Sequence, residues 1–204
     1  MKSWFAALAL LLAAPALAAA QPRDISAPGT VPHAAAHAGF PERVGEFERS
    51  QVLRFDDRDI AANYNLERGS DFVRLSVYIY PAPRASGRER ASTCQELMRG
   101  VSDAIFQQYP GAIVDESGAA PAVPDVEADL GLRSVHSIRV NLRGTQPEDA
   151  RSESRLYCFV GGDWLVKYRV STNAGSDIDL GALIDDFIRR GPWPGRGPAS
   201  IALR

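Results

Sequence analysis

The sequence has few of the residues and none of the short motifs that enzymes most often use. It contains three histidines and two cysteines among 204 residues. The predicted folded region lacks G-x-S-x-G, G-x-G-x-x-G and P-loop motifs, so it does not indicate nucleophile-elbow hydrolases, dinucleotide-binding enzymes or P-loop enzymes. The formal net charge is −2, and this absence of basic bias argues against a nucleic-acid partner. We therefore predict a non-catalytic protein without a cofactor.

The first twenty residues have the composition of a secretory signal peptide. Lys2 precedes an apolar run over residues 4–14, and alanines at 18–20 offer a small-residue cleavage site. As a membrane anchor the run is short, and Pro15 interrupts it. We predict cleavage after residue 20 and an exported protein, periplasmic or secreted, with no membrane span after cleavage.

Cys94 and Cys158 are the only two cysteines of the chain. In an oxidising compartment, an even pair is expected to form a disulfide. Two buried thiols are the alternative. A catalytic redox pair is disfavoured, because the chain has no C-x-x-C spacing and no basic residue beside either cysteine.

Composition divides the mature chain into three parts. Residues 21–40 are rich in proline, alanine and glycine without a periodic apolar pattern, which predicts a flexible leader. Residues 41–194 are long enough for one domain with its own core. Residues 195–204 are expected to be a loose tail.

Hydrophobic periodicity predicts the elements of this domain. Alternation with a period of two predicts strands at 47–55, 60–66, 72–80, 135–143, 151–160 and 164–172. Apolar residues spaced i, i+3, i+4 predict helices at 94–108 and 180–188. The expected fold class is therefore α+β, with a mostly antiparallel sheet of about six strands in a β-β-β-α-β-β-β-α order and helices packed on the sheet.

The hairpin around residues 161–163 has two possible registers. A two-residue loop would place Tyr157 on the side of Val166 and Tyr168, whereas a three-residue loop would place Leu156 and Cys158 there. We expect the three-residue loop, because it aligns the apolar residues of both strands and turns Cys158 toward the helix that carries the other cysteine.

Four stretches resemble a class of uncharacterised exported bacterial proteins, a domain of unknown function. They are residues 41–49 (PERVGEFER), 77–81 (VYIYP), 164–169 (WLVKYR) and 191–194 (GPWP). The order of strands and helices also resembles the α/β sandwich of the PsbP, Mog1 and LpqN type. Many members of that type are binding or accessory proteins, so the resemblance implies such a role, although a fold does not determine a function.

Two patterns are weak metal-site candidates. His33 and His37 would share one face of a helix, but the glutamate of the H-E-x-x-H motif is missing. Asp125, Glu127 and Asp129 alternate like the start of a calcium loop, but a leucine stands where the sharp turn needs glycine. We predict no metal site.

The most informative pattern lies at the polar positions of the predicted strands, which alternate with the apolar positions. If these positions share one face of the sheet, basic and aromatic side chains gather there and could hold an anionic envelope component. The predicted binding residues are Arg74, Tyr78, Tyr80, Arg139, Lys167 and Arg169. The alternative is an ordinary solvated or helix-covered face. The long acidic segment 111–132, expected to be a loop, could also fold over this face and neutralise it.

The function predicted from these features is an exported, non-catalytic envelope protein that binds an anionic ligand or partner through this face. The alternative is a periplasmic hydrolase whose carboxylates are brought together by the fold, such as Asp56 with Asp57 or Asp185 with Asp186. Adjacent acids on a strand or helix diverge, which disfavours each of these pairs. His136 is expected to be a hydrogen-bonded core histidine and not a general base.

Overall fold

The structure is a computed structural model that describes residues 21–69, 71–140, 148–173 and 179–197. The predicted signal peptide and residues 198–204 of the predicted tail lie outside the described residues. No helix in the described part is long and apolar enough to cross a membrane.

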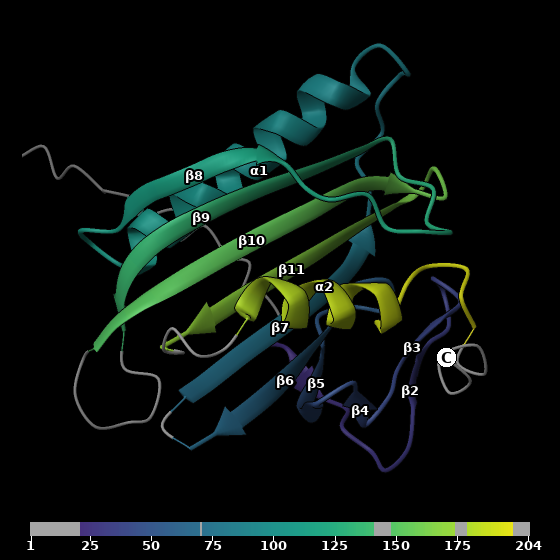
Figure 1. Cartoon of the computed structure of the whole chain (residues 1–204). Coiled ribbons are helices and arrows are strands. Elements are labelled where there is room, and N and C mark those ends of the chain that lie inside the picture. The colour runs from purple at the N-terminus through teal and green to yellow at the C-terminus, as the bar shows by residue number, and fades with distance from the viewer. Residues whose placement is uncertain (1–20, 70, 141–147, 174–178, 198–204) are drawn as a thin grey trace, which may run out of the picture.

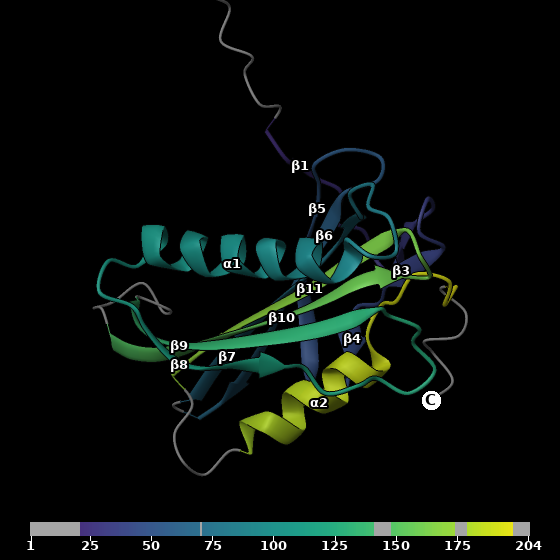
Figure 2. The same ribbon diagram turned by 90° about the horizontal axis from the view of Figure 1, so that it is seen from above.

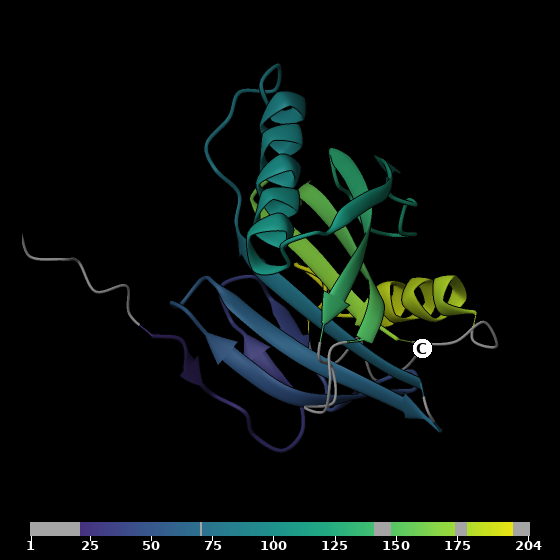
Figure 3. The ribbon, with the colours of Figure 1, turned by 90° about the vertical axis from the view of Figure 1, so that its left-hand side faces the viewer.

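A nine-stranded antiparallel sheet forms the body of the molecule (Figure 1). Its strands are β1 (Arg23–Asp24), β4 (Arg43–Val44), β5 (Phe47–Arg54), β6 (Ile60–Arg68), β7 (Asp71–Pro81), β8 (Ile113–Ala119), β9 (Leu130–Val140), β10 (Glu148–Val160) and β11 (Trp164–Thr172). Their order is β1-β5-β6-β7-β11-β10-β9-β8, and β4 pairs with β5. Figure 3 shows the twist that rotates the green strands of the second half against the blue strands of the first.

Two helices lie on opposite faces of this sheet (Figure 2). Helix α1 (Arg90–Gln108) packs over β9 and β10. Helix α2 (Leu180–Arg190) begins after Asp179, whose carboxylate accepts a hydrogen bond from the Ala182 N–H as an N-cap. The molecule therefore has an α1 side and an α2 side.

The predicted six-stranded α+β fold is wrong, because the described part is richer in strand. The six predicted strands and the two helices occur, with α1 starting earlier, at Arg90. Residues 141–143 of the strand predicted at 135–143 lie outside the described residues. The sheet gains three strands: β1, within the predicted flexible leader, β4, and β8, within the segment 111–132 that was expected to be a loop. All seven residues of β8 are exposed, so no alternation of apolar and polar residues marks it as a strand.

The larger core lies on the α2 side of the sheet. Val77 of β7 and Tyr168 of β11 face the buried Phe187 of α2. The ring centroids of Tyr168 and Phe187 are 6.2 Å apart, and Trp193 closes the layer with its centroid 5.5 Å from Tyr168. Trp193 donates its indole N–H to the carbonyl of Ile188, so the chain after α2 is fixed against the helix.

A second, smaller core lies on the α1 side. Cys94 and Met98 of α1 pack against Leu156, Cys158 and Leu165 of the sheet. Cys94 and Cys158 form the predicted disulfide, which ties the N-terminal half of α1 to β10.

Residues 31–40, which we expected in a flexible leader, instead belong to the larger core. They form the hairpin of β2 (Val31–His33) and β3 (Ala38–Phe40), and His33 and Phe40 are fully buried. His33 Nε2 lies 3.3 Å from the Ile79 carbonyl oxygen. Six of the ten residues are buried, but they include small residues and a histidine at irregular spacing, so they produce no periodic apolar signal in the sequence.

The predicted register of the β10–β11 hairpin is wrong at Leu156 and Cys158. The loop has the three expected residues, but a bulge shifts the pairing between Tyr157 and Val160. Phe159, with φ of 56°, occupies the left-handed region there. Tyr157 therefore lies opposite Val166 on the α2 side, whereas Leu156 and Cys158 face α1.

Candidate functional site

Five of the six predicted binding residues share the α1 side of the sheet. In the β7–β11 pairing, Tyr80 lies opposite Leu165, and Tyr78 lies opposite Lys167. One alternation further along the strands, Arg169 lies opposite Ser76, and Arg74 lies opposite Ser171. The alternation of these two strands therefore places Arg74, Tyr78, Tyr80, Lys167 and Arg169 on one face of the sheet.

Arg139 does not belong to this face. In β9, Ser134 and His136 point to the α1 side, so the alternation places Arg139 on the opposite side, opposite Asp149. The prediction assumed that the apolar positions of every strand face the same core. The two cores lie on opposite faces, and the apolar parity of β9 faces the smaller one under α1.

A groove of about 550 Å³ runs between α1 and this face of the sheet. One wall is the apolar flank of α1 with Leu97, Val101 and Ala104, and the opposite boundary includes Pro83 and Lys167. Thr93 and Glu96 add polar groups near the N-terminal half of the helix. This volume is in the range of sites that hold small molecules.

Lys167 is the unusual residue of this groove. Its Nζ lies 4.1 Å from the centroid of the Tyr78 ring, and the side chain is half-buried. Burial lowers the pKa of the ammonium group, and Arg169 lowers it further, while Asp59 opposes the shift. Among the described residues, Lys167 has no carboxylate at ion-pair distance.

The two arginines of this face also lack a carboxylate partner within the described ranges. Arg169 donates to Gln108 Oε1 at 3.0 Å, and its guanidinium lies 5.6 Å from the Tyr109 ring centroid. Arg74 is exposed and lies over the ring of Phe72. Among the described residues, the face thus carries three cations without a carboxylate at ion-pair distance.

The acidic segment 111–132 does not neutralise this face, contrary to one expectation. In β8, Asp115 accepts a hydrogen bond from Ser137, and Glu116 pairs with Arg133. Asp129 pairs with Arg90 at the start of α1.

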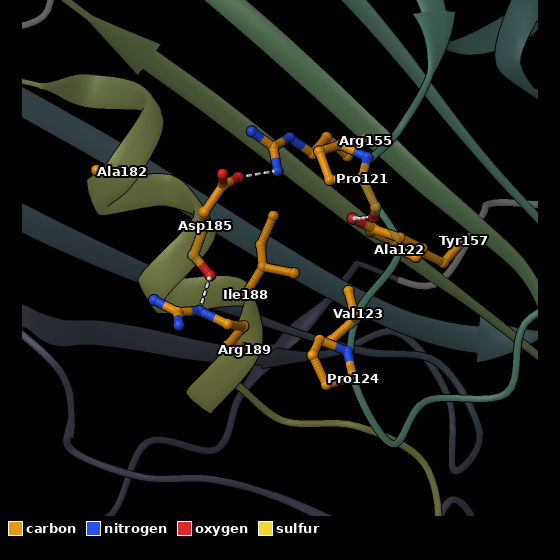
Figure 4. A pocket seen from close by; sticks show the side chains of 10 residues that line it. All are labelled: Pro121, Ala122, Val123, Pro124, Arg155, Tyr157, Ala182, Asp185, Ile188 and Arg189. Carbon is orange, nitrogen blue, oxygen red and sulfur yellow. Dashed lines mark hydrogen bonds and ion pairs between the residues drawn. The ribbon is translucent and has the colours of Figure 1, made fainter.

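A second pocket, of about 430 Å³, lies on the α2 side between α2 and residues 121–124 (Figure 4). Its buried Arg155 pairs with Asp185 of α2 at 2.5 Å and with Glu153 at 2.7 Å. Arg133 donates to both oxygens of Glu153, at 2.9 and 3.2 Å. Burial acts in the opposite direction, but the bonds from the two arginines hold the pKa of the Glu153 carboxyl below its usual range.

The charges of this second pocket are therefore engaged with one another. Figure 4 shows the Arg155 guanidinium directed at Asp185, and the Arg189 side chain bound to the Asp185 carbonyl. A ligand that used Arg155 would have to displace a carboxylate from it. We assign this network to the packing of α2 on the sheet. The sequence did not reveal this network, because Arg155 lies at a polar position of its strand that was expected to face away from the core.

Neither predicted acid pair forms a convergent site. Asp56 and Asp57 are exposed in a turn. Asp185 pairs with Arg155, whereas Asp186 pairs with Arg189 and Arg190. The part of the chain that the structure describes contains no group of three or more histidine, cysteine or acidic side chains that could hold a metal ion.

Sequence reasoning also missed the apolar wall of the groove. Leu97, Val101 and Ala104 follow i, i+4, i+7 spacing on α1, which is the pattern of a buried stripe, yet they line the groove.

Comparisons of the chain with protein-family models, with curated proteins and with solved structures found no match. The function has to be argued from this geometry.

Proposed function

We propose that this is an exported, non-catalytic binding protein that holds an amphipathic anion in the groove between α1 and the sheet. One observation carries the proposal: Lys167 is half-buried beside an apolar wall with no carboxylate partner among the described residues. A partly desolvated cation of this kind is stabilised by a ligand that brings the opposite charge.

The surroundings of Lys167 suit a ligand with an anionic head and an apolar body. An anion at ~4 Å from the ammonium gains about 4 kcal/mol of Coulomb energy at the effective dielectric constant of a protein surface. Arg169, two residues along β11 on the same face, extends the positive field. Leu97 and Val101 offer apolar area, which contributes roughly 25 cal/mol for each Å² removed from water.

Isothermal titration calorimetry with dodecyl phosphate at low salt tests the proposal. We expect Lys167→Met to weaken binding at least tenfold, equivalent to about 1.4 kcal/mol. Arg99→Met is the matched control, because it removes one positive charge as Lys167→Met does. Arg99 is exposed on α1 and does not line the groove. Its affinity should stay within about twofold of the parent. Equal binding by the parent and Lys167→Met would refute the proposal.

Two further probes separate charge recognition from simple apolar binding. Octaethylene glycol dodecyl ether is uncharged, and dodecyltrimethylammonium is cationic, but both carry the same alkyl chain. We expect both to bind more weakly than dodecyl phosphate, and raised salt to reduce the difference. If all three bind with one affinity, the groove does not recognise anions.

Export is part of the proposal, and the disulfide supports it because such bonds persist in oxidising compartments. Intact-mass analysis of the protein expressed with its first twenty residues in a secreting bacterial host should give a chain that starts at Gln21. A chain that retains residues 1–20 would contradict the predicted signal peptide.

A further inference from the structure

Buried polar side chains without partners concentrate under the C-terminal half of α1. In the described part, eight buried side-chain nitrogen or oxygen atoms have no hydrogen-bond partner. Five of them belong to Ser134, His136, Ser152 and Ser154, which we call the hydroxyl–imidazole floor. Because buried polar groups are nearly always hydrogen-bonded, such a concentration needs an explanation.

The floor is a compact unit on the α1 side of the sheet. Ser152 lies directly opposite His136, and Ser154 lies directly opposite Ser134, across the β9–β10 pair. Each of the four residues is at most 3% exposed. Directly opposite residues in such a pair have their Cβ atoms about 5 Å apart, so the four side chains can contact one molecule.

The floor adjoins the groove of the proposed function. Ser154 lies opposite Arg169 in the β10–β11 pair, and Leu156, one alternation along, lies opposite Lys167. Arg169 therefore lies between Lys167 and the floor on the α1 side of the sheet, and no carboxylate of the described residues separates the two cations from the serine hydroxyls.

The C-terminal half of α1 covers the floor with little apolar packing. Ile105 is its only buried residue in the stretch 99–108, and Phe106 is 39% exposed while its ring meets the His136 ring edge-on. Arg169 holds this end of the helix through Gln108 and Tyr109. An anion that binds Arg169 would compete with those two contacts and release the helix end.

We propose that the hydroxyl–imidazole floor binds hydroxyl groups of the ligand's anionic head, so that the ligand is a polyol or sugar phosphate with an apolar chain. This inference rests on the proposed function and specifies its ligand. Serine hydroxyls both donate and accept hydrogen bonds, and a neutral imidazole does the same at its two nitrogens. Such a set matches hydroxyl groups, whereas Lys167 and Arg169 match the phosphate.

The test uses two anionic lipids of equal charge. Lauroyl lysophosphatidylglycerol and lauroyl lysophosphatidylmethanol share the chain and the phosphodiester, and only the glycerol ester has hydroxyls on its head group. By titration calorimetry, we expect the parent protein to bind the glycerol ester about tenfold more tightly. Lys167→Met should weaken both lipids, because the phosphate contact is common to them.

A triple variant with Ser134, Ser152 and Ser154 replaced by alanine isolates the floor. It should lose the preference for the glycerol ester, keep the affinity for the methanol ester, and melt at the same temperature as the parent or higher. Removing unpartnered buried hydroxyls does not destabilise a fold, whereas removing hydroxyls that hold internal water does. A lower melting temperature would therefore overturn the inference in favour of a structural water site. The single variant Ser154→Ala is measured in the same way, with the same two lipids and the same melting experiment, and perturbs the fold less.

The outcomes separate the two proposals. Equal affinity of the parent for both lipids overturns the inference and leaves the anion-binding groove in place. Binding of neither lipid overturns the groove and the inference together. Gln108→Ala removes one contact that holds the helix end over the floor, so it should raise the affinity for the glycerol ester; a lowered affinity would contradict the role given to Arg169.

Discussion

Removing the disulfide should lower the free energy of unfolding by several kcal/mol. The bond joins residues 64 apart in sequence, and the chain-entropy relation gives roughly 4 kcal/mol for a loop of this length. Both cysteines are fully buried in the small α1-side core, so Cys94→Ala with Cys158→Ala loses packing as well. With a urea dependence of about 2 kcal/mol per molar, the midpoint of unfolding should fall by roughly 2 M.

Urea unfolding followed by circular dichroism measures this shift, and the reduced parent protein serves as the control. Because the bond holds α1 against β10, the same variant should also bind dodecyl phosphate more weakly. A midpoint that falls by less than about 0.5 M, near 1 kcal/mol, would show that α1 is held by its packing alone and refute the reasoning.

Three further predictions concern stability. Phe40→Ala should cost about 3–5 kcal/mol because Phe40 is fully buried, and an unchanged melting temperature would show that the β2–β3 hairpin is dispensable. Glu153→Gln should cost about 3 kcal/mol because it leaves two arginines without their shared carboxylate, whereas Glu116→Gln, with a side chain 58% exposed, should cost under ~1 kcal/mol in urea unfolding. Burial lowers the pKa values of His33 and His136 from 6.5. The unfolded chain therefore binds more protons below about pH 6.5, and the melting temperature should fall there; an equal slope in His136→Phe would contradict this origin.

Alternation predicts strands well only where one face of the strand is apolar. Residues 72–80 alternate cleanly because their apolar side chains enter the larger core, and β7 extends this range by one residue at each end. The same rule fails for β8, whose side chains are all exposed. It also fails for 31–40, where the contact that buries His33 is made with a residue 46 positions away.

For the candidate site, the sequence predicted which side chains of β7 and β11 share one face of the sheet. The clean alternation within β7 and within β11 predicted one shared face for Tyr78 and Lys167, but the pairing that sets them opposite each other is known only from the structure. The prediction for Arg139 was wrong because the apolar positions of β9 face α1, whereas those of β7 face α2. Which helix covers a strand depends on contacts between residues far apart in the sequence. The left-handed Phe159 was unpredictable as well, since glycine is the residue expected at such a conformation.

The central claim is that Lys167 anchors the anionic end of a ligand in the groove beside α1. A crystal structure of the protein with dodecyl phosphate tests it most directly. We predict a phosphate oxygen within about 4 Å of Lys167 Nζ, the ion-pair distance, and an alkyl chain along Leu97 and Val101. Dodecyl phosphate bound instead beside Arg155 in the α2-side pocket, with the groove at Lys167 unoccupied at saturating ligand, would contradict the claim.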